Sequence, residues 1–281
     1  MNRKFAGISL EKSIIMGILN LSKKTFYKDS LAKNPKEVKN RTEKMIENGA
    51  QIIDIGGMST GPNVKPISVE REKELLIPSI ENLREEITVP ISVDTQRSEV
   101  AKEAIEAGAD IINDISGFKA DENMAKIVSE YDCHAILMAN RIYDRLRTAE
   151  KKGKDVSNMK KIMKGLKENL KICKEHGINL EKIAIDPGIG FGKDAKEDIL
   201  VLSNLDALLE FNLPICIGVS RKSFIGKILE VEKPSERLPG SLGATAVGIF
   251  KNSADIIRTH DPKETFQFVR MIEKIQEEEE D

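Results

Sequence analysis

The chain has 281 residues, of which 40% are hydrophobic and 32% are charged, and its formal net charge is -2. This composition is typical of a compact globular protein, and it excludes the strong basic field that draws nucleic acids to a surface. No apolar run approaches the roughly 18 residues of a membrane span, and the N-terminus lacks the layout of a secretory signal, so we expect a cytoplasmic protein without a membrane partner.

Short runs rich in isoleucine and valine recur eight times along the chain, and each ends in polar or glycine residues. The segments between them place apolar residues three or four positions apart, as one buried face of a helix requires; Met159, Ile162 and Leu166 are an example. The predicted strands are Ile14–Leu19, Gln51–Ile55, Pro90–Val93, Asp110–Asn113, His134–Met138, Ile183–Ile185, Pro214–Val219 and Asp255–Ile257.

Strands that alternate with helices predict parallel pairing with right-handed crossovers. Eight such units in a chain of this length predict a single closed (β/α)8 barrel, the TIM-barrel architecture, with residues 1–281 as one domain. A doubly wound open sheet is the alternative, and we disfavour it because no Gly-x-Gly-x-x-Gly motif follows the first strand. We expect residues 1–8 to form a short N-terminal extension, either a strand or a small hairpin.

The stretch 186–193 puts a carboxylate at the end of an apolar strand and follows it with an open turn. Three glycines interleaved with Pro187 and Phe191 let the backbone pass close to a ligand, and they leave Asp186 facing the space above the strand. The alternative is a tight strand-to-helix turn with a capping aspartate. Polar residues at the ends of other strands favour the rim of a pocket.

In a barrel of this kind, the loops that follow the strands converge on one face. Asp94, Asn113 and Asp186 at or near strand ends, with Lys222 nearby, form a mixed set of donors and acceptors that suits a flat heterocycle. An ionised carboxylate accepts two parallel N–H bonds from an amino-pyrimidine edge, whereas an asparagine pairs with an adjoining donor and acceptor. The set therefore predicts recognition of a guanine-like or pterin-like ring.

Arg258 and His260 lie two positions apart after the last strand, so both point the same way if the segment stays extended. The loops after strands seven and eight usually bind phosphate in such barrels, and arginine offers a forked contact to phosphate oxygens. The pair predicts an anion site. The alternative is an Arg258 paired with a neighbouring carboxylate and a His260 buried in the wall. We interpret Asp114 and Asp261 as helix-capping residues.

Seven motifs of the chain, in this order, resemble those of dihydropteroate synthases, which belong to the pterin-binding (β/α)8 barrel family. Their joint occurrence is highly specific, and the resemblance extends almost from end to end. The motifs are Met16–Asn20, Gly49–Gly57, Ser92–Thr95, Ile112–Gly117, Asp186–Lys193, Ser220–Gly226 and Arg258–Asp261.

The resemblance implies a transferase of folate biosynthesis that condenses 6-hydroxymethyl-7,8-dihydropterin diphosphate with an aromatic amine and releases diphosphate. It implies Mg²⁺ as the cofactor, catalytic roles for Asp94, Asp186 and Lys222, and a homodimer formed through late helices. The implied ring ligands are Asp94, Asn113, Asp186 and Lys222. The implied diphosphate ligands are Asn20, which also contacts Mg²⁺, Arg258 and His260. The implied arylamine site contains Thr60, Pro62, Phe191 and Ser223.

The chain departs from the family pattern in three loops. Lys24 stands where the loop after Asn20 usually carries an acidic residue, and Gly61 stands where the second loop usually carries a diphosphate-binding arginine. The segment 137–140 lacks the usual histidine. Together these changes keep the site cationic but relocate its charge, and Lys23 or Lys24 would have to replace the arginine. The amine is therefore either 4-aminobenzoate or a ribosylated or phosphorylated arylamine.

Two other functions remain open. A methyltransferase that moves a methyl group from a tetrahydropterin to a corrinoid carrier shares the barrel and much of the ring-binding set, but it has no diphosphate to hold. A catalytically silent pterin-binding protein would keep the ring ligands and need no working loops. The residues 220–223, Arg258 and His260 favour the synthase. The apolar stripe Phe266, Val269, Ile272 and Ile275 fits either a dimer interface or plain core packing.

Overall fold

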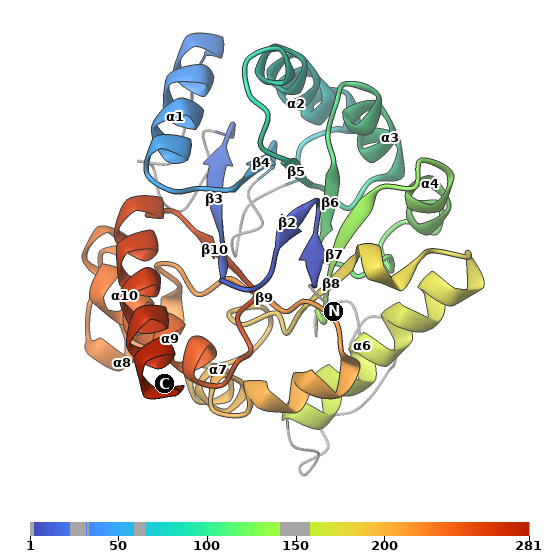
Figure 1. The fold of residues 1–281 in the computed structure, drawn as a ribbon. Coiled ribbons are helices and arrows are strands. Elements are labelled where there is room, and N and C mark those ends of the chain that lie inside the picture. The colour runs from blue at the N-terminus through green and yellow to red at the C-terminus, as the bar shows by residue number, and fades with distance from the viewer. Residues whose placement is uncertain (1–2, 23–31, 33, 59–65, 141–157, 281) are drawn as a thin grey trace.

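The computed structural model describes residues 3–22, 32, 34–58, 66–140 and 158–280. Within these ranges eight parallel strands form one sheet in the order β8-β7-β6-β5-β4-β3-β10-β9, surrounded by helices (Figure 1). The strands are β3 (Ile14–Asn20), β4 (Ile52–Gly56), β5 (Ile91–Asp94), β6 (Ile111–Asp114), β7 (His134–Met138), β8 (Ile183–Asp186), β9 (Cys216–Ile217) and β10 (Ile256–Thr259).

The two ends of this sheet meet beside β8. Ile185 forms a parallel bridge with Ile215, the residue that precedes β9, and its N–H donates to the carbonyl of Pro214 at 2.8 Å. The sheet is thereby closed into a cylinder, which confirms the predicted single (β/α)8 barrel and excludes the open doubly wound sheet.

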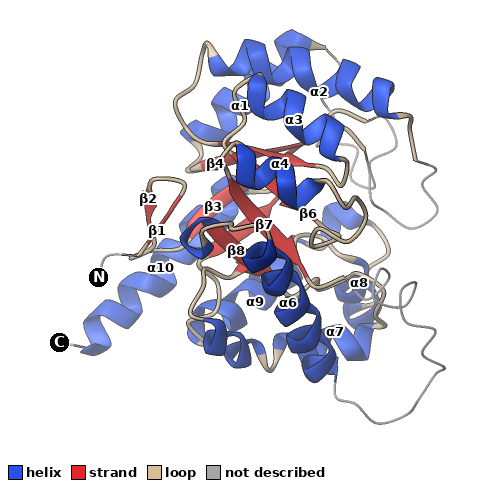
Figure 2. Ribbon diagram, turned by 90° about the vertical axis from the view of Figure 1, so that its right-hand side faces the viewer, coloured by secondary structure: helices blue, strands red, loops and turns tan. Residues whose placement is uncertain are grey.

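A ring of helices surrounds the strands, and the apolar core outside the barrel lies between the helices and the strands (Figures 1 and 2). Local signals explain several of their ends: Asn34 caps α1 by accepting from the N–H of Glu37, and Asp194 with Glu197 forms a capping box at the start of α7. Among the described residues, no helix is long and apolar enough to cross a membrane. The α-helices are α1 (Pro35–Glu47), α2 (Val69–Arg84), α3 (Ser98–Glu106), α4 (Met124–Glu130), α6 (Asn158–Glu175), α7 (Ala195–Leu202), α8 (Ser223–Leu229), α9 (Leu238–Phe250) and α10 (Pro262–Glu280), with the short 3₁₀ helices η2 (Leu180–Lys182), η3 (Leu205–Phe211) and η4 (Pro234–Glu236).

An N-terminal hairpin closes the amino-terminal end of the barrel. β1 (Lys4–Phe5) and β2 (Ile8–Ser9) pair antiparallel, which confirms the small hairpin among the two predicted possibilities (Figure 2). Phe5 is fully buried and packs in one cluster with residues from the inner face of the strands, among them Ile14, Ile52 and Ile111. Burying one phenylalanine side chain is worth about 1.5–3 kcal/mol. This plug leaves the opposite, carboxyl end of the barrel for a ligand.

Two predicted strand ranges differ from the structure by more than one residue at an end. The seventh was expected over residues 214–219, but only Cys216–Ile217 pair as a strand, because the neighbour on the β8 side contributes a single bridge. The eighth was expected to end at Ile257, but it continues through Arg258 and Thr259, since their backbones pair with Met16 and Gly17 of β3. The extension keeps Arg258 inside the barrel wall.

Candidate active site

A row of aligned residues marks the carboxyl end of the barrel. Asn20 of β3 pairs with Gly56 of β4, Gly56 with Asp94 of β5, and Asp94 with Asn113 of β6. Asp186 ends β8 two positions beyond Ala184, the residue aligned with Asn113 through Ile136, so it faces the same side as this row. Asp94, Asn113 and Asp186 are all buried. Because side chains alternate across a strand, residues in one row at the same end of a barrel project into the same space. The structure therefore brings these predicted ring ligands to one mouth.

Arg258 connects this row to a carboxylate one layer deeper. Its Nε donates to Asp54 Oδ2 at 2.6 Å, and its Nη2 donates to Asp94 Oδ2 at 3.0 Å. Burial disfavours the charged guanidinium, but the two carboxylates outweigh burial and raise the pKa of Arg258. The alternative arrangement named for Arg258, an ion pair with neighbouring carboxylates, is thus present, while its contact to diphosphate stays a prediction.

Asp94 titrates near neutral pH in this environment. Burial raises the pKa of Asp94 to about 7, although Arg258 lowers it, and the Asp54 carboxylate raises it further. A carboxyl group that gains or loses its proton near pH 7 can adjust to a ring that offers N–H donors.

Asp186 and Lys222 form the second charged pair of the mouth. Burial raises the pKa of Asp186, against the lowering effects of Lys222 and of the Gly188 N–H, which donates to Asp186 Oδ1 at 2.6 Å. Burial likewise lowers the pKa of Lys222 to about 8, against the effect of Asp186. Lys222 Nζ donates to the carbonyl of Ile189 and lies 4.5 Å from the centroid of the Phe191 ring. The lysine therefore crosses the glycine-rich loop.

That loop needs its glycines where the backbone approaches its neighbours. Gly190 has a φ of +81°, and a Cβ added to it would lie 2.6 Å from Lys222 Cδ. A Cβ on Gly188, with a φ of +67°, would lie 2.5 Å from the carbonyl oxygen of Ala139. Only glycine adopts such a backbone without strain and with this clearance. The glycines are therefore needed for the approach to Lys222 and Ala139, while the expected approach to a ligand stays a prediction.

His260 stands beside the charged mouth in its neutral form. Burial lowers the pKa of His260 to about 3, and the cations Arg258, Arg221 and Lys222 lower it as well. Its Nδ1 lies 3.0 Å from Ser220 Oγ, which also accepts from the His260 backbone N–H at 3.1 Å. The histidine is therefore a neutral hydrogen-bonding group beside three cations.

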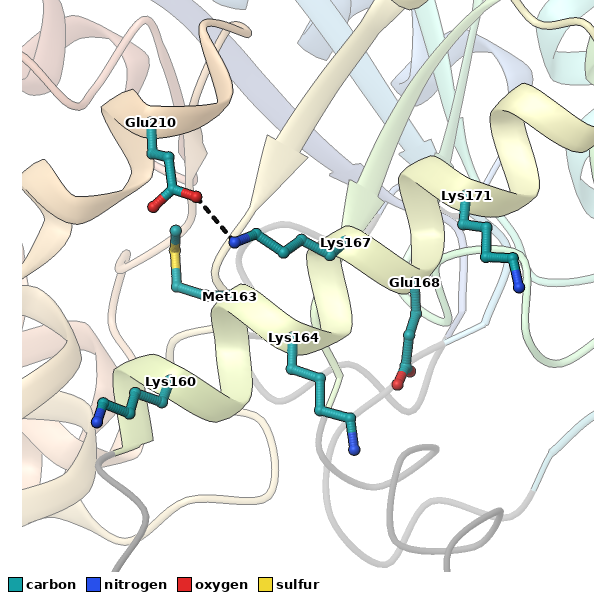
Figure 3. A pocket seen from close by; sticks show the side chains of 7 residues that line it. All are labelled: Lys160, Met163, Lys164, Lys167, Glu168, Lys171 and Glu210. Carbon is teal, nitrogen blue, oxygen red and sulfur yellow. Dashed lines mark ion pairs between the residues drawn. The ribbon is translucent and has the colours of Figure 1, made fainter.

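A cavity of about 650 Å³ between α1 and α10 reaches His260. Its charged lining residues are Arg41, Lys44 and Lys263 together with Asp261 and Glu264, so cations slightly outnumber carboxylates there. A second cavity of about 580 Å³ lies on α6, lined by four lysines, Met163, Glu168 and Glu210 (Figure 3). Lys167 pairs with Glu210 there at 2.8 Å, and none of the predicted site residues takes part. This second cavity is a charged, solvent-exposed part of the surface of α6.

The two aspartates interpreted as helix caps have structural roles of another kind. Asp114 accepts from the backbone N–H groups of Ser116 and Phe118, in the loop before α4. Asp261 precedes α10, but its carboxylate binds Arg221 at 2.8 Å and 2.5 Å. The capping prediction is wrong for both side chains, because stronger partners from a loop and from a distant arginine take their oxygens.

Asn20 ends β3, and its Oδ1 lies beside Gly56. Phe191 is half-buried under Lys222, and Ser223 is the exposed first residue of α8. Thr60 and Pro62, like Lys23 and Lys24, lie outside the described residues.

The family model of pterin-binding enzymes matches residues 16–260. The curated dihydropteroate synthase of Clostridium beijerinckii is 38% identical over 265 residues, which cover 94% of this chain and 95% of that one. The chain belongs to the dihydropteroate synthase family of pterin-binding enzymes.

Solved structures of this family share the fold over the whole chain. A Clostridium difficile dihydropteroate synthase, crystallised in the presence of pteroic acid, has a TM-score of 0.84 at 36% identity and covers 94% of this chain and 97% of its own. The Xanthomonas albilineans synthase with 4-aminobenzoic acid has a TM-score of 0.84 at 29% identity, with 96% of both chains covered. The resemblance stated from the seven motifs is confirmed.

One residue of this synthase-family site, Asp54, was given no role by sequence reasoning. It is a single carboxylate within the apolar strand β4, and it is fully buried. The signal in the sequence was its position within an apolar strand, because burying a carboxylate without a partner inside a barrel costs too much free energy. Its need for a partner predicts a cation such as Arg258, but the sequence does not say which one.

Proposed function

We propose that this chain is a transferase that condenses 6-hydroxymethyl-7,8-dihydropterin diphosphate with 4-aminobenzoate and releases diphosphate. The observation that carries the proposal is the meeting of Asp94, Asn113, Asp186 and Lys222 at one mouth, beside Arg258. The family membership supports it, and so do the ligands of two related structures, pteroic acid and 4-aminobenzoic acid.

The ring is held by the buried polar set. Asp186 and Asp94 accept N–H bonds from the ring, Asn113 pairs with an adjoining donor and acceptor, and Lys222 donates to an acceptor atom. Desolvation strengthens each of these bonds, because the three acidic and amide groups are buried. A ring that leaves one of them unpaired is rejected for the same reason.

The diphosphate binds on the His260 side of the mouth, between Arg258 and the cavity that Arg41, Lys44 and Lys263 line together with Asp261 and Glu264. Arg258 offers a forked, permanently charged contact, and the neutral His260 offers an N–H. Mg²⁺ fits this half of the site: Asn20 supplies an amide oxygen, and magnesium is usually held by one or two protein groups together with substrate phosphates. When bound, the ion would neutralise charge on the departing diphosphate.

The reaction exchanges one bond for another at the methylene carbon. The C–O bond breaks and its electron pair leaves with the diphosphate, while the lone pair of the amine forms the C–N bond and the nitrogen then loses a proton. Asp94 and Asp186 favour the positive charge that develops on the ring and methylene, and Arg258 and His260 favour the departing anion. No covalent enzyme intermediate is needed.

The amine binds above the ring, where Lys222 and Phe191 lie together and Ser223 is exposed. Ser223 is able to donate its hydroxyl to an acidic substituent of the aryl group. Lys23 and Lys24, outside the described residues, leave a ribosylated or phosphorylated arylamine as the alternative acceptor, because phosphate would find two added cations.

The test is release of diphosphate from the pterin diphosphate with Mg²⁺ and each of three conditions: 4-aminobenzoate, a ribosylated arylamine, or no amine. Release that depends on 4-aminobenzoate supports the proposal, and D186N should reduce it at least a hundredfold. E74Q, at an exposed residue of α2, is the control and should leave it unchanged. Release with the ribosylated arylamine but not with 4-aminobenzoate would identify the ribosylated arylamine as the acceptor. Binding of the pterin diphosphate without release of diphosphate would refute the transfer function.

We also propose that the protein forms a homodimer and is located in the cytoplasm. Val269 and Ile272 of the predicted stripe are buried in the core, and only Ile275 at its end is largely exposed. Exposed apolar side chains also occur at Leu229 on α8 and Phe250 on α9. A dimer interface would therefore use the rims of α8 to α10. Sedimentation analysis tests it.

A further inference from the structure

Asp54 lies one layer below the predicted ring ligands. In the sheet it is aligned with Ile18 of β3 and Ser92 of β5, two positions before the row that contains Gly56 and Asp94. It is fully buried, with no exposed surface. The pterin ring, if it binds in the row above, is therefore supported by Asp54 from underneath.

Its carboxylate joins three of the groups around the mouth. Oδ1 accepts from Ser92 Oγ at 2.7 Å, and Oδ2 accepts from Arg258 Nε at 2.6 Å. Asn113 Nδ2 lies 3.4 Å from both oxygens. One carboxylate thus contacts a residue proposed for the ring, Asn113, and a residue proposed for the diphosphate, Arg258.

Asp54 and Asp94 also share the same cation. Arg258 is bound to Asp54 through Nε and to Asp94 through Nη2, at 3.0 Å. A ring that donates N–H groups to both oxygens of Asp94 competes with this second contact, because Arg258 already donates to Oδ2. The strength with which Asp54 holds Arg258 sets how easily Asp94 is released.

We infer that Asp54 is a positioning residue for pterin recognition: it anchors Arg258 and Asn113 from below and shares Arg258 with Asp94, so that Asp94 does not hold the cation alone. The inference rests on the proposed function for the identity of the ring. Without the Asp54 charge, Arg258 pairs with Asp94 alone, and the ring meets a carboxylate that is already neutralised. The affinity for inorganic diphosphate increases in that case, because a buried negative charge near its site has been removed.

The test uses D54N, which keeps the size of the side chain and removes its charge. We expect the affinity for 6-hydroxymethylpterin, a ring without diphosphate, to fall at least tenfold by calorimetric titration. The affinity for inorganic diphosphate with Mg²⁺ should fall by less than threefold or increase. A smaller fall for the ring, or an equal fall for both ligands, would overturn the inference, since a merely structural role weakens both.

Two further variants distinguish a specific effect on ring binding from a general loss of folding. D255N removes a partly buried carboxylate that binds the Ile215 N–H and Arg3 at the other end of the barrel. It should lower the melting temperature and leave ring affinity unchanged. S92A keeps the Asp54 charge but removes one of its hydrogen bonds, and should weaken ring binding two- to fivefold. If D54N does not fold, an S92A protein with normal ring affinity overturns the inference.

The pH dependence supplies a readout that packing alone would not move. Asp94 faces Arg258 of β10 and Asp54 of β4, and more weakly Glu72 of α2 and Asp114 of β6. Since Asp54 raises the pKa of Asp94, D54N should move the acidic limb of ring binding to lower pH. Ring binding needs no turnover, so a wild-type protein without transferase activity would refute the proposed function and leave this test intact.

Discussion

Removal of the Arg258 charge should destabilise the protein, and by more at alkaline than at acidic pH. R258M leaves the carboxylates of Asp54 and Asp94 without their shared cation, and their side chains are only 0% and 9% exposed. Removing one partner of a buried ion pair costs about 3–5 kcal/mol. Because the Arg258 side chain itself is 21% exposed, we take the lower end, about 3 kcal/mol.

The sign of the pH effect follows from Asp94. Its pKa of about 7 in the folded protein lies above the value of about 3.9 expected for an unfolded aspartate. The folded state therefore binds this proton more tightly, and stability falls as pH rises from about 4 to 7. R258M removes a lowering contribution to that pKa, so the fall extends to higher pH. The penalty of R258M should be largest near pH 8 and smaller near pH 5.

The assay is thermal unfolding of both proteins at pH 5 and pH 8. For a chain of this size, about 3 kcal/mol corresponds to a decrease in Tm of roughly 6–12 °C at pH 8. R71M is the control, because Arg71 pairs with Glu74 on an exposed surface, where an ion pair is worth about 1 kcal/mol or less. An R258M penalty that is equal at both pH values, or greater at pH 5, would refute the reasoning.

Two other predictions concern the glycine-rich loop and the lysine that crosses it. K222R replaces an amine whose pKa is about 8 by a guanidinium that stays charged, so the alkaline limb of kcat/KM near pH 8 should disappear while activity falls; a limb that persists would assign it to another group. G190A puts a methyl group 2.6 Å from Lys222 Cδ at a φ of +81°, which should cost about 1–3 kcal/mol of stability and at least tenfold in kcat/KM. G243A, whose Cβ meets nothing within 4 Å in α9, is the matched control and should be neutral or stabilising in the same unfolding assay.

Local patterns in the chain were enough to predict the fold class and to select residues that the structure places at one end of the barrel. Strand and helix periodicities depend on residues a few positions apart, so they can be read without knowing the tertiary structure. Once eight alternating units imply a parallel barrel, the carboxyl ends of all strands must share one face. That argument alone selected Asp94, Asn113, Asp186 and Lys222, and the structure brings them to one mouth.

Only the tertiary structure decided which charges meet inside that mouth. Asp54 and Arg258 are 204 positions apart, and Asp94 and Arg258 are 164 apart. Whether such residues touch depends on the strand register and on the closure between β8 and β9. A change of two residues in the register moves a side chain by one whole layer of the barrel. The same dependence explains why the carboxylate of Asp261 binds Arg221 instead of capping its helix. Residue type and spacing determined the chemistry available at the barrel end, and three-dimensional register determined its pairing.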